Sequence, residues 1–166
     1  MHNSNFIVIL QAKFLAMSIM EDKYGVIFAD DGETLSECPK DLSGEYIVPE
    51  GVLDIDRGAF SKCAALTSII IPDSVAFIGE YAFSDCHGLT SITLPYNVIK
   101  IEEGAFMGCI NLETLIIKNP KIDIDDESCA FLDCPLKKIV IPKGSKEHFK
   151  MLKGFKGYRR IMVEEK

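Results

Sequence analysis

Apolar residues return at regular intervals through most of the chain, in short runs separated by polar turns. One run ends in proline and recurs as Ile69–Pro72, Ile92–Pro95 and Ile139–Pro142. A degenerate copy, Leu115–Ile117, has its proline displaced to Pro120. Because alternate side chains of a strand point to opposite faces, each copy predicts a short strand with one buried face.

Two further signals follow each of these strands. An apolar pair, Val-x-x-Ile, comes first, as in Val75 and Ile78, and the sequence Ala-Phe-x-x-Cys comes next. The latter begins at Ala59, Ala82, Ala105 and Ala130, at intervals of 23, 23 and 25 residues. A fixed period of this size is typical of a solenoid. The sequence therefore predicts a mainly β solenoid with a parallel strand ladder and short helical or turn segments.

The phenylalanines and cysteines of these turns are predicted to point inward, where one residue per coil stacks on the next. This structural ladder comprises Phe60, Phe83, Phe106, Phe131, Cys63, Cys86, Cys109 and Cys134. Equal positions of adjacent coils lie about 4.8 Å apart, beyond the Cβ separation of about 3.8 Å in disulfides. Zinc needs four converging ligands, and cysteines spaced along a line do not converge. Cys38 and Cys129 lie off this ladder and are expected to be unpaired.

Outward positions of the same strands form two columns, and these are the candidate binding face. One column is Ser68, Ser91, Thr114 and Lys138, and the other is Ile70, Thr93, Ile116 and Val140. Stacked repeats present a continuous surface of this kind to partners, and exposed branched apolar groups suit a protein contact. The alternative is that β-branched residues simply favour strands.

Flanking segments of a different character bound the array. Residues 25–45 are predicted to form an N-terminal hairpin cap, because Asp31-Gly32 separates two apolar runs. Residues 46–142 are the repeats. Residues 143–166 are predicted to form a C-terminal cap, with a helix over 146–153 that begins at Ser145 and stops at Gly154, and a strand over 160–164.

The first 24 residues are either a leader or a degenerate first coil. Residues 6–20 are apolar, but the run is too short to span a bilayer comfortably, so no membrane span is expected. Residues 1–5 carry no Lys or Arg, so this is a poor signal peptide. Whether residues 1–20 are the native start, a signal remnant or the first coil stays open.

The last full repeat contains an insertion at residues 119–129. Because Leu136 also follows Cys134 one residue early, the strand interval from Ile117 to Ile141 is 24, and the register of the strand is expected to hold. The inserted acidic string 123–127 offers carboxylates that suit calcium, but it lacks the spacing of a dedicated calcium loop. Calcium binding therefore stays open.

The net charge of −7 argues against nucleic acid as a partner. The charge is uneven: residues 1–136 carry 8 Lys and Arg against 22 Asp and Glu, whereas residues 137–166 carry 10 against 3. Opposite charge at the two ends permits head-to-tail self-association. The simpler interpretation is two solvated regions of opposite sign.

Catalysis has little support in the sequence. The three histidines, His2, His87 and His148, lie in the leader, a turn and the cap helix, and none is near a plausible nucleophile and orienting acid. There is no phosphate-binding loop or dinucleotide fingerprint. We therefore expect a protein without catalytic residues, cofactor or metal.

The repeat resembles the BspA-like, or Treponema-type, leucine-rich repeats, whose unit of about 23 residues carries Leu-x-x-Ile-x-Ile-Pro, Val-x-x-Ile and Gly-x-x-Ala-Phe-x-x-Cys. Residues 46–142 fit this unit, although Asp56 and Glu102 replace the glycine that Gly79 matches. The resemblance implies a bacterial cell-surface or secreted adhesion protein, which binds a host matrix or another cell-surface protein and is not an enzyme. The alternative is a structural protein that assembles through its oppositely charged ends.

Overall fold

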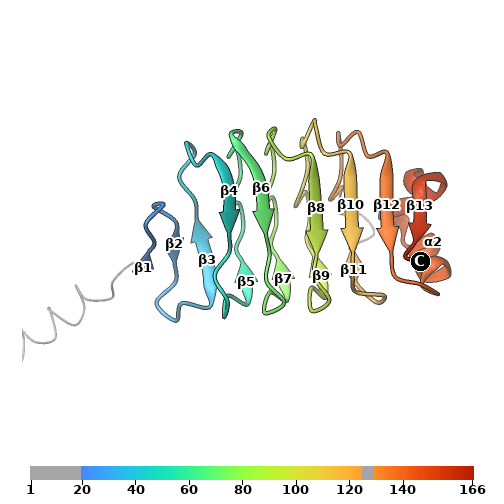
Figure 1. Cartoon of the computed structure of the whole chain (residues 1–166), viewed down its shortest axis with the longest axis horizontal. Helices are drawn as coiled ribbons and strands as arrows, with labels where there is room; N and C mark the ends of the chain where they lie inside the picture. Colours follow the sequence, from blue (N-terminus) through green and yellow to red (C-terminus); the bar gives the residue numbers. More distant parts are fainter. Residues whose placement is uncertain (1–19, 125–128) are drawn as a thin grey trace, which may run out of the picture.

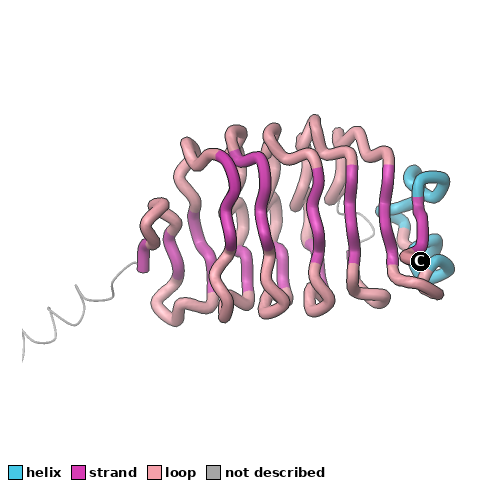
Figure 2. Tube along the Cα trace, viewed as in Figure 1, coloured by secondary structure: helices cyan, strands magenta, loops and turns pink. Residues whose placement is uncertain are grey.

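Successive repeats wind into coils that stack side by side along one axis in the computed structural model (Figure 1). The structure describes residues 20–124 and 129–166. Each coil holds one long strand, one short strand and the turn that carries Ala-Phe-x-x-Cys, and helices occur only beside the C-terminal end of the described stack (Figure 2). This confirms the predicted leucine-rich repeat solenoid.

The long strands run in parallel along one side of the stack. They are β4 (Gly44–Ile47), β6 (Leu66–Ile70), β8 (Ser91–Leu94), β10 (Thr114–Ile117), β12 (Lys138–Ile141) and β13 (Met162–Glu164). Hydrogen bonds join β4 to β6, and they join β8, β10, β12 and β13 in that order. Strands β6 and β8 lie side by side (Figure 1). Thr114 pairs with both Ser91 and Lys138. The predicted register is therefore confirmed, and the insertion does not shift it.

The short strands form a second sheet on the other side of the core. Its members in order are β1 (Met20–Glu21), β2 (Ile27–Phe28), β3 (Thr34–Glu37), β5 (Asp54–Ile55), β7 (Phe77–Ile78), β9 (Lys100–Ile101) and β11 (Asp123–Ile124). The pairs β1–β2 and β2–β3 are antiparallel and the others are parallel. This confirms the predicted hairpin, whose turn is held by Asp31 Oδ1 accepting a 2.8 Å bond from the Glu33 N–H.

Aromatic rings form a continuous stack through the core. Phe60, Phe83, Phe106 and Phe131 lie at centroid distances of 5.0, 5.1 and 5.3 Å, with planes within 7°. Tyr46 covers the N-terminal end of this stack. Such contacts add about 0.5–1.5 kcal/mol per pair beyond burial, so the rings stabilise the coils against one another.

The C-terminal cap departs from its prediction in detail. Helix α2 spans Lys146–Met151, and Gly154 lies inside a following 3₁₀ helix, Lys153–Ile161 (η1), so the predicted stop at Gly154 is wrong. The helix ends because Leu152 takes an extended conformation. Ser145 precedes the helix, but its hydroxyl donates to the Pro142 carbonyl instead of capping it. The final strand is β13, shorter than predicted.

The cap nevertheless covers the last coil. Phe155 stacks on Phe131 at 5.7 Å, Phe149 is fully buried, and the Tyr158 hydroxyl donates to the Phe131 carbonyl at 3.0 Å. These contacts supply the terminal cover that a repeat stack requires.

One cysteine outside the thiol ladder contacts a member of it. Cys38 is not one of the equivalent ladder positions, as predicted, but it is fully buried and its Sγ lies 3.3 Å from that of Cys63. Pattern matching missed this contact because no Ala-Phe-x-x-Cys motif surrounds Cys38. Cys129 is an exposed free cysteine.

Candidate binding surface

The polar column of the candidate face follows the pairing of the long strands. Ser91, Thr114 and Lys138 are direct partners across β8, β10 and β12. Ser68 on β6 pairs with Glu45 on β4, whose carboxylate accepts a 3.4 Å bond from the Ser68 hydroxyl. Short hydroxyl groups therefore line the middle of this column, with Glu45 and Lys138 toward its two ends.

The apolar column lies two residues further along each strand. Thr93, Ile116 and Val140 are partners across β8, β10 and β12, and Ile70 continues the column on β6. Ile70 and Thr93 are exposed, whereas Ile116 and Val140 are half-buried. The intervening residues point inward and are buried, as in Ile92 and Leu115. The strand pleat thus separates this face from the core.

The structure adds two residues that the sequence interpretation left out of this column. Ile47 on β4 pairs with Ile70, and Val163 on β13 pairs with Val140. Ile47, Ile70 and Val163 are 59%, 47% and 44% exposed. The repeat period could have identified both, because Ile47 lies 23 residues before Ile70 and Val163 lies 23 residues after Val140.

Together these residues form a face that we call the strand-ladder face: the polar column with Glu45 added, and the apolar column with Ile47 and Val163 added. Its margin carries ion pairs between neighbouring coils. Lys137 Nζ lies 2.5 Å from Glu113 Oε1, and Lys118 pairs with Glu165. Exposed pairs of this kind contribute only about 0–1 kcal/mol, so the margin stays hydrated and polar around an apolar stripe.

A groove of about 600 Å³ bounds the N-terminal end of the strand-ladder face. Its lining residues are Asp22, Lys23, Tyr24, Glu45, Ile47 and Pro49. Asp22 shapes it, because this carboxylate accepts bonds from the Tyr24 N–H at 2.8 Å and the Tyr46 hydroxyl at 2.7 Å. Burial, together with the bond to Asp22, raises the pKa of Tyr46. The groove extends the apolar column toward the exposed ring of Tyr24.

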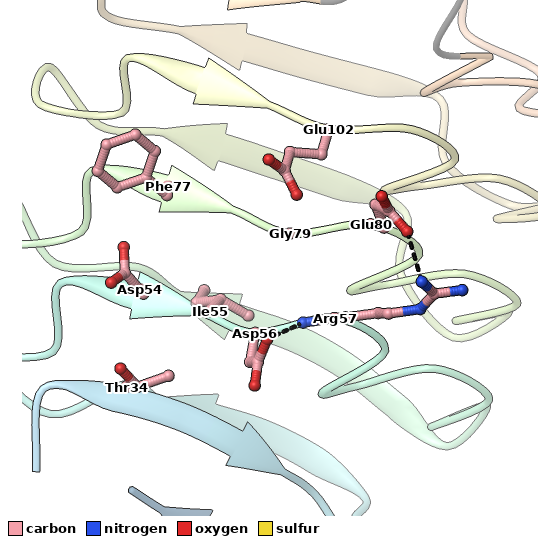
Figure 3. A pocket seen from close by; sticks show the side chains of 9 residues that line it. All are labelled: Thr34, Asp54, Ile55, Asp56, Arg57, Phe77, Gly79, Glu80 and Glu102. Atoms are coloured by element: carbon pink, nitrogen blue, oxygen red, sulfur yellow. Dashed lines mark hydrogen bonds and ion pairs between the residues drawn. The ribbon is translucent and has the colours of Figure 1, made fainter.

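The second sheet carries a smaller depression of about 470 Å³ (Figure 3). Arg57 and Glu80 form an ion pair across part of it at 2.8 Å. Burial, followed by the charges of Asp31 and Asp56, raises the pKa of Asp54. Among the described residues, no three His, Cys, Asp or Glu side chains are grouped to hold a metal ion.

The histidines and the acidic string that the sequence analysis considered for catalysis or calcium binding remain to be placed. His87 is near Asp85 at 3.9 Å, and His148 lies 3.2 Å from the Ile122 carbonyl oxygen. His2 lies outside the described residues, as do residues 125–127 of the acidic string, so calcium binding stays untested. Asp123 of that string belongs to β11.

Comparison with known proteins turns on the repeat. Residues 40–151 match six copies of the BspA type leucine rich repeat region, which covers more than half of the chain. The chain belongs to the BspA-type leucine-rich repeat family. No curated protein matches it. Among the described residues of this BspA-type protein, no helix is long and apolar enough to cross a membrane.

Solved structures share this BspA-type fold. A leucine rich cell surface protein from Faecalibacterium prausnitzii is 23% identical with a TM-score of 0.60, over 78% of this chain and 41% of that one. A leucine-rich repeat protein from Bacteroides ovatus is 28% identical with a TM-score of 0.58, over 81% and 36%. One from Bacteroides capillosus is 27% identical with a TM-score of 0.61, over 74% and 97%. The chain thus spans less than half of the first two relatives.

Proposed function

We propose that this chain is a non-enzymatic protein-binding module of a secreted or cell-surface protein, and that the strand-ladder face recognises its partner. The expected partner is a host matrix protein or another cell-surface protein. The main support is the apolar column from Ile47 to Val163, which lies exposed or half-buried beside a column of short polar groups. Membership of the BspA-type family and similarity to the Faecalibacterium prausnitzii cell surface protein support the proposed location.

The physical case rests on the combination of the two columns. Interface cores are apolar and their rims are polar and hydrated, and the strand-ladder face offers both on a rigid support. Residues two apart on a strand are about 6.6 Å apart, so one partner segment can contact both columns. Rigid strands also reduce the entropy that binding would cost.

Substitution of the face tests the proposal. A variant with Ile70→Lys, Thr93→Lys and Ile116→Lys places three charges in the apolar column. We expect it to keep its circular dichroism spectrum and to lose at least tenfold in binding to matrix proteins or cells, because a charged core excludes an apolar partner surface. The matched control is Phe77→Lys with Ile99→Lys, which changes exposed apolar residues elsewhere on the chain. A folded triple variant that binds as well as the unchanged protein would contradict the proposal.

The charge asymmetry favours a second candidate, self-association through the two ends. The basic residues 137–166 comprise strand β12 and the C-terminal cap, at the end of the stack opposite the N-terminal hairpin. Light scattering at low and high salt tests it, since end-to-end attraction would weaken with salt. A monomer at both salt concentrations would contradict it.

A further inference from the structure

The backbone places Cys38 where later coils have phenylalanine. The N–H groups of Phe60 and Phe83 each donate to the alanine carbonyl of the next coil, at 2.7 Å. The Cys38 N–H makes the same bond, to Ala59 at 2.8 Å. Cys38 is therefore the counterpart of Phe60 and Phe83 in the first coil, although its side chain is much smaller.

This substitution changes what the next thiol meets. The thiols of Cys86, Cys109 and Cys134 each donate to the carbonyl of a phenylalanine in the preceding coil, at 3.0–3.1 Å. The coil before Cys63 has Cys38, and not a phenylalanine, at the corresponding position. Its Sγ lies 3.3 Å from that of Cys38 and 3.6 Å from the Pro39 carbonyl oxygen. The small side chain at the phenylalanine position thus brings two sulfurs into contact.

The strain that opposes disulfides between equal ladder positions does not apply here. Equal positions are one strand spacing apart and point the same way. Cys38 and Cys63 occupy different positions of their coils, and their sulfurs converge. The pair also joins two separate parts of the fold, because Cys38 follows strand β3 of the N-terminal hairpin and Cys63 ends the turn of the first full repeat.

We propose that Cys38 and Cys63 form a disulfide that fastens the N-terminal hairpin to the repeat array. The oxidant is an external disulfide, as in glutathione disulfide. One cysteine thiolate attacks it, forms a mixed disulfide and releases one thiol. The second thiolate then attacks the mixed disulfide and releases the other thiol. Two protein thiols and one external disulfide thus yield one protein disulfide and two external thiols.

Burial determines when this exchange takes place. Both side chains are fully buried, so an external disulfide reaches them only before the hairpin docks or when it opens. Contact with Cys63 and burial raise the pKa of the Cys38 thiol, which lowers its thiolate content in the folded protein. Oxidation is therefore slow in the folded chain and fast during refolding.

Refolding of the full chain in a buffer of reduced and oxidised glutathione tests the proposal. We expect a mass loss of two hydrogen atoms, a Cys38–Cys63 linked peptide after alkylation and proteolysis, and a rise in Tm of roughly 5–10 °C that a reductant reverses. Cys38→Ala should abolish the link and the rise in Tm, whereas Cys86→Ala should retain both. Free Cys38 and Cys63 thiols in the oxidised buffer, or a link from Cys63 to another ladder cysteine, would overturn the proposal, and neither result depends on a variant that folds.

Discussion

At the scale of single residues, the buried thiols show how the coils are joined. Cys86 is fully buried, and its thiol donates to the Phe60 carbonyl of the preceding coil at 3.0 Å. Burial raises the pKa of the Cys86 thiol to about 12. A cysteine here acts as a small apolar group with a weak donor, so its ionisation is coupled to folding.

This coupling predicts a loss of stability at alkaline pH. The folded chain keeps Cys86 protonated up to about pH 12, whereas an unfolded cysteine ionises near pH 8.5–9, so the unfolded state gains from thiolate formation as pH rises. When the pH rises from 8 to 10, the free energy of unfolding of Cys86→Ala should therefore fall by about 1 kcal/mol less than that of the unchanged protein. Urea unfolding at both pH values measures the difference.

The cavity left by alanine lowers the free energy of unfolding by the same amount at both pH values. This effect therefore cancels when the losses between pH 8 and pH 10 are compared. Cys129→Ala removes an exposed thiol and is the matched control, which should behave like the unchanged protein. Equal losses for Cys86→Ala and the unchanged protein would show that the Cys86 thiol is not buried as described.

At the scale of elements, the turns depend on backbone conformations that the sequence allows at few positions. Gly104 opens the turn of its coil with a φ of 59° and is buried. A Cβ atom there would lie 2.3 Å from a ring carbon of Tyr81 in the preceding coil. Tyr81 in turn donates its hydroxyl to Glu103 at 2.9 Å. The space that Gly104 leaves therefore lets one turn pack against the next.

Substitution of this glycine tests how tightly the turns stack. Gly104→Ala should lower the free energy of unfolding by roughly 1–3 kcal/mol, because alanine disfavours positive φ and the Tyr81 ring must move. Gly157→Ala is the control, since a Cβ at that position of η1 meets nothing within 4 Å. Thermal unfolding measures both variants. Similar effects of the two changes would argue against the stacked turns.

The helices and strands also show how much of the fold the repeat period predicts. The period of 23 predicts the long strands and their register, because each strand must bury the same face. It does not predict the position of Cys38, which matches later coils in its hydrogen bonding and not in its sequence. Nor does it predict η1, because no Ala-Phe-x-x-Cys motif follows Pro142 and contacts such as Phe155 with Phe131 hold this segment on the last coil.

At the scale of the whole molecule, both ends of the array are covered and one face is left available. At the N-terminal end of the stack, strands β1–β3 extend the second sheet beyond β5. At the other end, α2 and η1 lie beyond β12 (Figure 1). Between these caps the apolar column crosses six strands from Ile47 to Val163. The sequence identifies four of its members, and the two at its ends follow from the strand pairing. Their role in binding stays a prediction.

A photo-crosslinking amino acid introduced on this face tests the central claim most directly. One chain carries the probe at Thr93, in the apolar column, and a control chain carries it at Phe77, which is 42% exposed on the second sheet. After irradiation on cells or matrix protein, we expect covalent adducts from the probe at Thr93 and few from that at Phe77. Adducts from Phe77 with none from Thr93 would contradict the assignment of the strand-ladder face as the binding surface.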